Sequence, residues 1–337
     1  MKTILAIFAI ACGAALYALW DEDPPTASTS GGIIAAVAGG DVAAFPTLDL
    51  PKALAAQGAE APSDIGADGI NKLLRMASER VDRYNSIAAL IRYRVQLFNS
   101  ELIGSGLYQQ AGQGSERRTR LELRTQLGDE VAGRLQVCDG EALWTYRETP
   151  TGTQLERLDL RRLRAAQRQA ATLPPNSPVD ELVTGGLPKL LEGLNLNFRT
   201  LKAESGYLDE AAMWAIELVW KPSVLAALVP DQKESINAGE PCNFAELPQL
   251  PERVMVFLGH EDLFPRRIEF RRRGSGNEEP NGAGDGGGAE FVSVLTVEFT
   301  DVQLNQPIDP RQFIYGAEGA TDVTDAYLQS RGLPIVR

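Results

Sequence analysis

The sequence predicts a mainly β (α+β) protein, in which a single strongly curved antiparallel sheet of about eleven strands carries helices against its dry face. Two observations predict this fold. Apolar and polar residues alternate along many short segments, as they do in strands with one buried and one solvated face. These segments also follow one another at hairpin spacing, and only a few helical segments interrupt them.

A helix is expected first, because apolar residues recur every three or four positions from Ile70 to Ile87, behind the N-cap candidate Asp68. The period then changes to two. The candidate strands are residues 91–97, 102–109, 121–127, 133–138, 142–148, 153–159, 197–206, 211–221, 252–258, 265–273 and 289–303. Helical segments interrupt them at 160–195 and 222–250, and the glycine-rich residues 274–288 predict a flexible hairpin tip.

The N-terminal residues predict export. An uncharged run from Ile4 to Trp20 follows Lys2 and precedes three acidic residues, so the chain after it is expected to cross the membrane. As a helix this run would span about 26 Å, against roughly 30 Å for a hydrocarbon core. No good cleavage site ends it, which favours an uncleaved signal anchor (1–20) over a signal peptide without excluding the latter. A flexible linker rich in Ala, Pro and Gly (21–67) follows, and the folded domain is expected over 68–330.

Composition excludes some partners. The 337 residues are 44% hydrophobic, which is enough for a substantial core, and carry a formal charge of -12. Such an acidic chain is a poor electrostatic partner for nucleic acid or for an anionic membrane surface. Membrane contact is therefore expected only through the N-terminal helix.

The usual catalytic and cofactor-binding motifs are missing from the sequence. It has no GxSxG elbow, Walker A loop, HExxH or strand-linked GxGxxG. The single histidine, His260, stands between two strand segments with no nucleophile or second ligand near it in sequence. An exposed turn explains it better than a general base or a metal ligand. We predict a protein that is not an enzyme and that has no metal or cofactor.

The stretch QVCDGEALWTY, residues 136–146, resembles a reactive or metal-binding cluster but fits a tight hairpin better. Asp-Gly is the dipeptide that a two-residue type I′ turn prefers, so Glu141 is assigned to the following strand. Cys138 and Cys242 would be exported together, and the sequence leaves open whether they form a disulfide or remain thiols. A thiol in a strand is usually a small core residue.

Apolar surface is in excess on the predicted sheet. A sheet this wide exceeds what one or two helices can cover, so part of its concave face is expected to bind an apolar ligand, with acyl chains the natural candidate beside a membrane. The candidate groove residues are Tyr93, Val95, Leu121, Leu123, Leu135, Trp144, Trp214, Ile216, Leu218, Leu295 and Val297.

Four motifs, in order, resemble those of the periplasmic outer-membrane lipoprotein carriers, the LolA/LolB-like superfamily. They are YNSIAA at 84–89, GSGLY at 104–108, VCDGEALWTY at 137–146 and IDPRQFIY at 308–315, followed by Gly319, Asp322 and Val323. The resemblance covers roughly residues 70 to 327. It implies a half-open β-barrel with a helical lid that holds lipid or lipoprotein acyl chains without covalent chemistry. The N-terminal anchor would keep this domain on the periplasmic side of the inner membrane.

This chain also departs from the family. The family's carriers are smaller and soluble, and an arginine after their first hairpin latches the lid; here residues 109–114 read QQAGQG and supply no arginine. A tethered protein suits a second hypothesis as well: an envelope sensor or interaction module that reuses the fold to recognise a protein partner. The identity of the ligand and the oligomeric state are left open by the sequence.

Overall fold

The computed structural model describes residues 67–97, 100–127, 130–170, 178–208, 211–245, 247, 250–274, 291–316 and 318–336. The predicted anchor (1–20), the linker up to residue 66 and the glycine-rich loop after Gly274 lie outside these residues. Within the described part of the chain, no helix is long and apolar enough to cross a membrane.

One 12-stranded sheet dominates the fold, in the order β12-β6-β5-β4-β3-β2-β1-β11-β10-β9-β8-β7. The strands are β1 Ser86–Leu97, β2 Ser100–Ala111, β3 Arg118–Leu127, β4 Glu130–Cys138, β5 Ala142–Thr149, β6 Gly152–Asp159, β7 Phe198–Leu208, β8 Ala211–Trp220, β9 Arg253–Gly259, β10 Pro265–Arg273, β11 Phe291–Leu304 and β12 Thr321–Asp322. Neighbours are antiparallel except β12, which pairs in parallel with β6.

The predicted sheet is confirmed, and each candidate strand is present. The added member is the two-residue edge strand β12. The first and last long strands, β1 and β11, pair at the middle of the sheet, so the order of strands is not their order in the chain. Because β7 and β12 stand at opposite ends of the order, the curved sheet is not closed into a full barrel.

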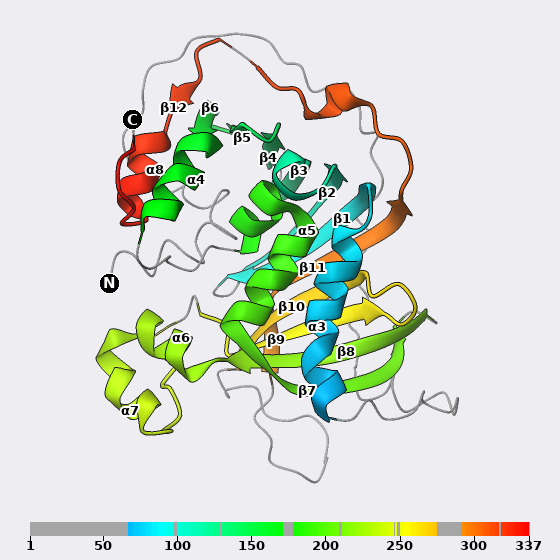
Figure 1. The fold of residues 1–337 in the computed structure, drawn as a ribbon, viewed down its shortest axis with the longest axis vertical. Coiled ribbons are helices and arrows are strands. Elements are labelled where there is room, and N and C mark those ends of the chain that lie inside the picture. Colours follow the sequence, from blue (N-terminus) through cyan, green and yellow to red (C-terminus); the bar gives the residue numbers. More distant parts are fainter. Residues whose placement is uncertain are drawn as a thin grey trace.

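The helices are α3 Ala67–Asp82, α4 Leu160–Gln169, α5 Pro178–Asn197, α6 Pro222–Leu228, α7 Lys233–Asn237 and α8 Thr324–Ser330. Helices α3 and α5 lie side by side across one face of the sheet (Figure 1), where Ser78 Oγ of α3 donates a hydrogen bond to Pro188 O of α5 (2.9 Å). Helices α4 and α8 cover the β5–β6 end, and α6 and α7 form a separate small cluster beside β8.

The first helix is shorter than its sequence pattern. It ends at Asp82, and Ile87 already belongs to β1. Ile87 nevertheless points into the same core as Leu74 and Val81 of the helix, because β1 continues against the surface that α3 covers. A helix and the strand after it can share one core, and their apolar residues can then continue one helical spacing. The spacing alone therefore predicted a helix that extends beyond its actual end.

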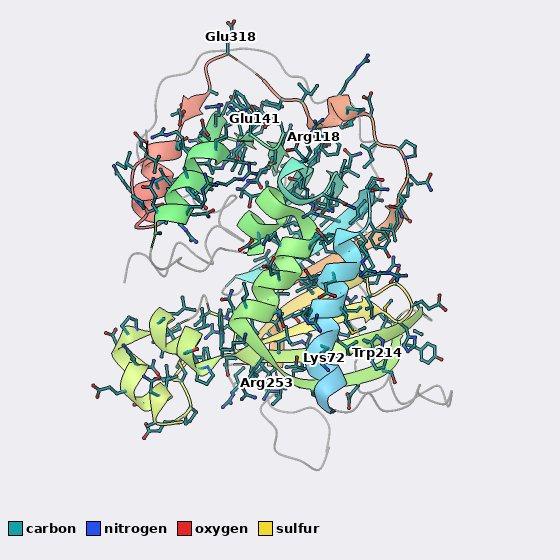
Figure 2. All side chains as sticks on the ribbon, viewed as in Figure 1. Lys72, Arg118, Glu141, Trp214, Arg253 and Glu318 are labelled. Atoms are coloured by element: carbon teal, nitrogen blue, oxygen red, sulfur yellow. The ribbon has the colours of Figure 1, made fainter. Side chains whose placement is uncertain are left out.

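The Asp139-Gly140 turn differs from its prediction. Only Gly140 has a positive φ (96°), and the loop has three residues, since β5 begins at Ala142. Asp139 Oδ1 accepts hydrogen bonds from Glu141 N (2.8 Å) and Ala142 N (2.7 Å), which fixes a side-chain-closed turn in place of type I′. Glu141 therefore lies exposed in the turn (Figure 2), where it pairs with Arg161 of α4.

Candidate functional site

Nine of the predicted groove residues share the concave face of the sheet, the face that α3 and α5 cover. The strand register places them there, because residues paired across neighbouring strands point to the same face. Val95 pairs with Leu295, Tyr93 pairs with Val297, and Val297 pairs with Ile268. The nine are Tyr93, Val95, Leu121, Leu123, Trp214, Ile216, Leu218, Leu295 and Val297. The structure brings them into one core cluster, and whether any of them contacts a ligand stays a proposal.

Leu135 and Trp144 do not belong to this surface, and grouping them with the other nine was wrong. Leu121 pairs with Gln136 across β3 and β4, so Gln136 shares the concave face and Leu135 points to the outer face. Val137, two residues after Leu135, points the same way and pairs with Trp144. Trp144 instead packs against Tyr315, with ring centroids 6.0 Å apart, in the segment that follows β11. Strands β4 and β5 carry apolar residues on both faces, so a period of two could not identify the concave one.

The concave face is covered by the chain's own helices. Six of the nine residues are buried, packed in one cluster with Leu73 and Leu74 of α3 and Leu187 and Leu191 of α5. The other three, which are Tyr93, Leu123 and Val297, are only partly buried. The six buried positions are therefore out of contact with solvent while α3 and α5 stay in place, whereas the other three are partly open to it.

Tyr93 lies flat across β2. Its partner there is Gly104, and a Cβ at Gly104 would overlap the Tyr93 ring, so glycine is what lets the ring cross the strand. The Tyr93 hydroxyl donates to Arg124 O (3.1 Å) and hydrogen-bonds with Thr125 Oγ1 on β3. Burial raises the pKa of Tyr93 to about 12, opposed by the Thr125 hydrogen bond and the nearby charge of Arg134. This phenol stays neutral at physiological pH.

Helix α5 is broken at Gly186, whose φ of 75° and ψ of -176° lie in a region that only glycine adopts readily. Pro188 follows two residues later and also opposes a continuous helix. The break faces four polar side chains from β2 and β3 and the residue just before β3. We call these four the polar latch: Tyr108, Gln110, Arg117 and Thr119.

The first half of the polar latch holds the backbone just after the break. Leu187 N donates hydrogen bonds to Tyr108 Oη (3.1 Å) and Gln110 Oε1 (3.1 Å). The Tyr108 hydroxyl donates in turn to Gln110 Oε1 (2.8 Å), and both side chains are fully buried. Burial also raises the pKa of Tyr108, so its hydroxyl keeps its proton.

The second half holds the carbonyls before the break. Arg117 Nη1 donates to Gly185 O (2.8 Å), and Thr119 Oγ1 donates to Val183 O. Arg117 also pairs with Asp82 at the end of α3 (Nη2–Oδ1, 2.5 Å), so it joins both helices to the sheet. Its side chain is 4% exposed, against 53% for that of Asp82. A buried guanidinium on a helix carbonyl is a strong, charge-assisted hydrogen bond.

Sequence reasoning missed the polar latch. It searched residues 109–114 for an arginine, whereas Arg117 comes after the turn that those residues begin. The sequence did contain a signal for buried polar groups. Gln110 and Thr119 occupy positions that the period of two assigns to the dry face, and buried polar side chains need hydrogen-bond partners. Gly185, Gly186 and Pro188 likewise indicated a break in the helix, since glycine and proline interrupt helices.

The two cysteines and the histidine lie apart from the polar latch. Cys138 and Cys242 are both free thiols, so the disulfide left open by the sequence is not formed; Cys138 belongs to the main core and Cys242 packs against the α6–α7 cluster. Burial raises the pKa of the Cys138 thiol, which keeps it protonated and inert. His260 lies in the β9–β10 turn and stacks on Trp214, with ring centroids 4.9 Å apart. Among the described residues, no group of three or more His, Cys, Asp or Glu could hold a metal ion.

The fold and this site define a half-open antiparallel barrel whose apolar concave face is closed by a broken helix. No protein-family model matches the sequence, and no curated protein matches it. Solved structures with a similar fold include LprF from Mycobacterium bovis (TM-score 0.34, 9% identity, 74% of this chain and 97% of that chain). Lipoprotein LppX from Mycobacterium tuberculosis is similar as well (TM-score 0.32, 10% identity, 72% and 98%).

A third similar structure is a domain described as an outer-membrane lipoprotein-sorting protein, from Vibrio parahaemolyticus (TM-score 0.30, 8% identity, 72% of this chain and 95% of that chain). Because the TM-scores lie below 0.5, the likeness carries no conclusion about what this chain binds.

Proposed function

We propose that this protein reversibly holds acyl chains of lipids or lipoproteins between the concave face of its sheet and helix α5, without covalent chemistry. The observation that carries the proposal is the pairing of an apolar concave face with a broken helix that a few polar side chains fix over it. The resemblance of the sequence motifs to lipoprotein carriers supports acyl chains as the ligand.

The energetics of exchange favour a reversible lid. An acyl chain that replaces the leucines of α5 on the concave face gains about 0.8 kcal/mol per buried CH2, which offsets the burial that the helix loses. The two apolar terms are of the same kind and largely cancel. The hydrogen bonds of the polar latch, each contributing about 1 kcal/mol net, then decide whether the helix or the ligand occupies the face.

Entry is expected at the partly buried end of the concave face. Tyr93 and Leu123 lie together there, since Tyr93 crosses β2 and reaches β3 at Thr125, two residues beyond Leu123. A chain end that inserts at Leu123 would meet the buried residue Leu121 next on the same face of the same strand. The proposed path thus runs from β3 towards the space beneath α5.

Replacing Leu123 by glutamine tests this proposal. We expect full-length protein in a nonionic detergent to bind a neutral fluorescent acyl probe, and Leu123→Gln to weaken that binding about tenfold, because a polar amide replaces apolar contact area on the path. The measurement is a fluorescence titration with each purified protein.

Leu90→Gln is the matched control, because Leu90 is 42% exposed on the outer face of β1 and its replacement should alter neither stability nor binding. Failure of the wild-type protein to take up the probe would refute acyl binding. Equal uptake by wild type and Leu123→Gln would place the binding site elsewhere.

We further propose that the protein is exported and stays tethered by residues 4–20, so that the sheet faces the periplasm. The uncharged N-terminal run and the acids that follow it support this placement. Mass spectrometry of protein purified from its own membranes should find Met1 to Trp20 retained. A mature N-terminus beyond residue 20, on protein recovered from the soluble fraction, would show a cleaved signal and a diffusing carrier.

A further inference from the structure

The GSGLY segment of β2 leaves part of the concave face without side chains. Gly104 pairs with Tyr93 of β1. Gly106 pairs with Leu123 of β3, and both of these partners point to the concave face. Because cross-strand partners share a face, the two glycines lie on it as well, and β2 presents no side chain at either position. We call Gly104 and Gly106 the glycine strip.

Side chains from the two neighbouring strands fill the space over the glycine strip. The Tyr93 ring lies over Gly104, where a Cβ would overlap it. A Cβ at Gly106 would lie 3.0 Å from Leu123 Cδ2. Tyr93 and Leu123 are also two of the three concave residues that are only partly buried. They therefore close the strip from opposite sides, at the part of the concave face that solvent reaches.

The glycine strip has the width of one acyl chain. Neighbouring strands lie about 4.8 Å apart, so the side chains of β1 and β3 that border the strip are separated by about 9.6 Å. Carbon atoms in contact lie about 4 Å apart, which leaves room between these borders for one row of carbon atoms and not for two. A single unbranched chain therefore fits on the strip once the side chains that cover it have turned aside.

The two covering side chains are held in different ways. The Tyr93 hydroxyl donates a hydrogen bond to Arg124 O (3.1 Å) and hydrogen-bonds with Thr125 Oγ1, so the ring reaches from β1 across β2 to β3. Leu123 has no polar atom and covers the strip by packing alone. Uncovering the strip therefore costs hydrogen bonds at Tyr93 and only a change of rotamer at Leu123.

The glycine strip leads to the polar latch. Tyr108 is the next residue after Gly106 on the same face of β2, and its hydroxyl accepts a hydrogen bond from Leu187 N (3.1 Å) just after the break in α5. A chain end that runs along the strip from its partly open side thus arrives where the polar latch holds α5. The strip and the latch follow one another on one path.

We propose that Tyr93 is the gate of this path, and that the ligand is a lipid whose unbranched chain enters the glycine strip end first. The hydrogen bonds to Arg124 O and Thr125 Oγ1 keep the gate closed until the chain displaces the ring. This inference rests on the proposed function. It adds the residue that admits the ligand and a class of ligand, since a chain that ends in a bulky group does not fit the strip.

The test titrates two neutral monoacylglycerols into full-length protein in nonionic detergent. The first carries a fluorophore on its glycerol, which leaves the chain end free, and the second carries the same fluorophore at the chain end. The wild type is expected to bind the first probe at least tenfold more tightly than the second. Tyr93→Phe keeps the ring and removes its hydroxyl, so it should bind the first probe about tenfold more tightly than the wild type does.

Thr125→Val tests the same hydrogen bond from β3. It should tighten binding of the first probe about threefold, because Arg124 O still holds the Tyr93 hydroxyl. In the Tyr93→Phe background it should add nothing, since the two hydroxyls act on each other. Tyr146→Phe is the matched control: Tyr146 pairs with Leu135 on the outer face, and its replacement should change neither the Tm nor the affinity.

The outcomes separate this inference from the proposed function. Equal binding of the first probe by the wild type and Tyr93→Phe overturns the gate and leaves acyl binding intact, whereas binding of neither probe by any variant overturns both. Weaker binding by Tyr93→Phe would make the hydroxyl a ligand contact, and additive effects of Tyr93→Phe and Thr125→Val would show that they do not form one closure; either result contradicts the gate. Equal binding of the two probes by the wild type overturns entry by the chain end along a strip one chain wide.

Discussion

Replacing Arg117 by alanine is expected to lower the Tm and at the same time to raise the apparent affinity for an acyl probe about tenfold. The substitution removes the hydrogen bond to Gly185 O and the ion pair with Asp82, at a cost of about 1–3 kcal/mol in the free energy of unfolding. If ligands bind only when α5 has moved, the same loss raises the open fraction, and 1.4 kcal/mol corresponds to a factor of 10. Thermal unfolding followed by circular dichroism measures the Tm, and a probe titration measures the apparent affinity.

Arg118→Ala is the matched control for this experiment. Arg118 follows Arg117 directly but is exposed (Figure 2), so neither the Tm nor the affinity should change appreciably. A lower Tm combined with a higher affinity in Arg117→Ala would distinguish a lid from an ordinary part of the core. A variant that loses stability and affinity together would show that α5 is part of the binding surface and does not have to move.

The sheet could be predicted from the sequence because its strands have one dry face and one wet face for most of their length. The period of two in residues 91–97 and 121–127 needs no knowledge of distant contacts. The same reasoning gave the face of Leu123 and Ile216 but failed at Leu135 and Trp144. In β4 and β5 both faces are apolar in part, and only pairing with β3 decides which of them is concave.

The polar latch escaped prediction for a different reason. The Arg117–Gly185 hydrogen bond joins residues 68 positions apart, and no local period records such a contact. The turn at Asp139 shows a smaller version of the problem, since the Asp139 side chain closes the loop and overrides the preference of the Asp-Gly dipeptide.

Gly186→Ala is expected to destabilise the protein strongly, through the backbone of α5. An alanine at φ 75° and ψ -176° is strained by about 1–3 kcal/mol, and its Cβ would overlap Gln110 Oε1. Moving Gln110 away breaks its hydrogen bond with Leu187 N, which adds about 1 kcal/mol. Urea unfolding should therefore give a loss of about 2–4 kcal/mol, with tighter apparent acyl binding, because the polar latch opens.

Gly193→Ala in the same helix is the control, and its expected effect has the opposite sign. A Cβ at Gly193 would meet Glu181 Cγ at an ordinary 3.5 Å, so the substitution should stabilise the protein by about 0.4–1 kcal/mol through the unfolded state. Straightening of α5 cannot rescue Gly186→Ala, since Pro188 keeps its helix-breaking ring and the backbone preference it imposes on Leu187. A Gly186→Ala variant as stable as the wild type would thus mean that the polar latch does not fix the break, and the role we assign to it would be lost.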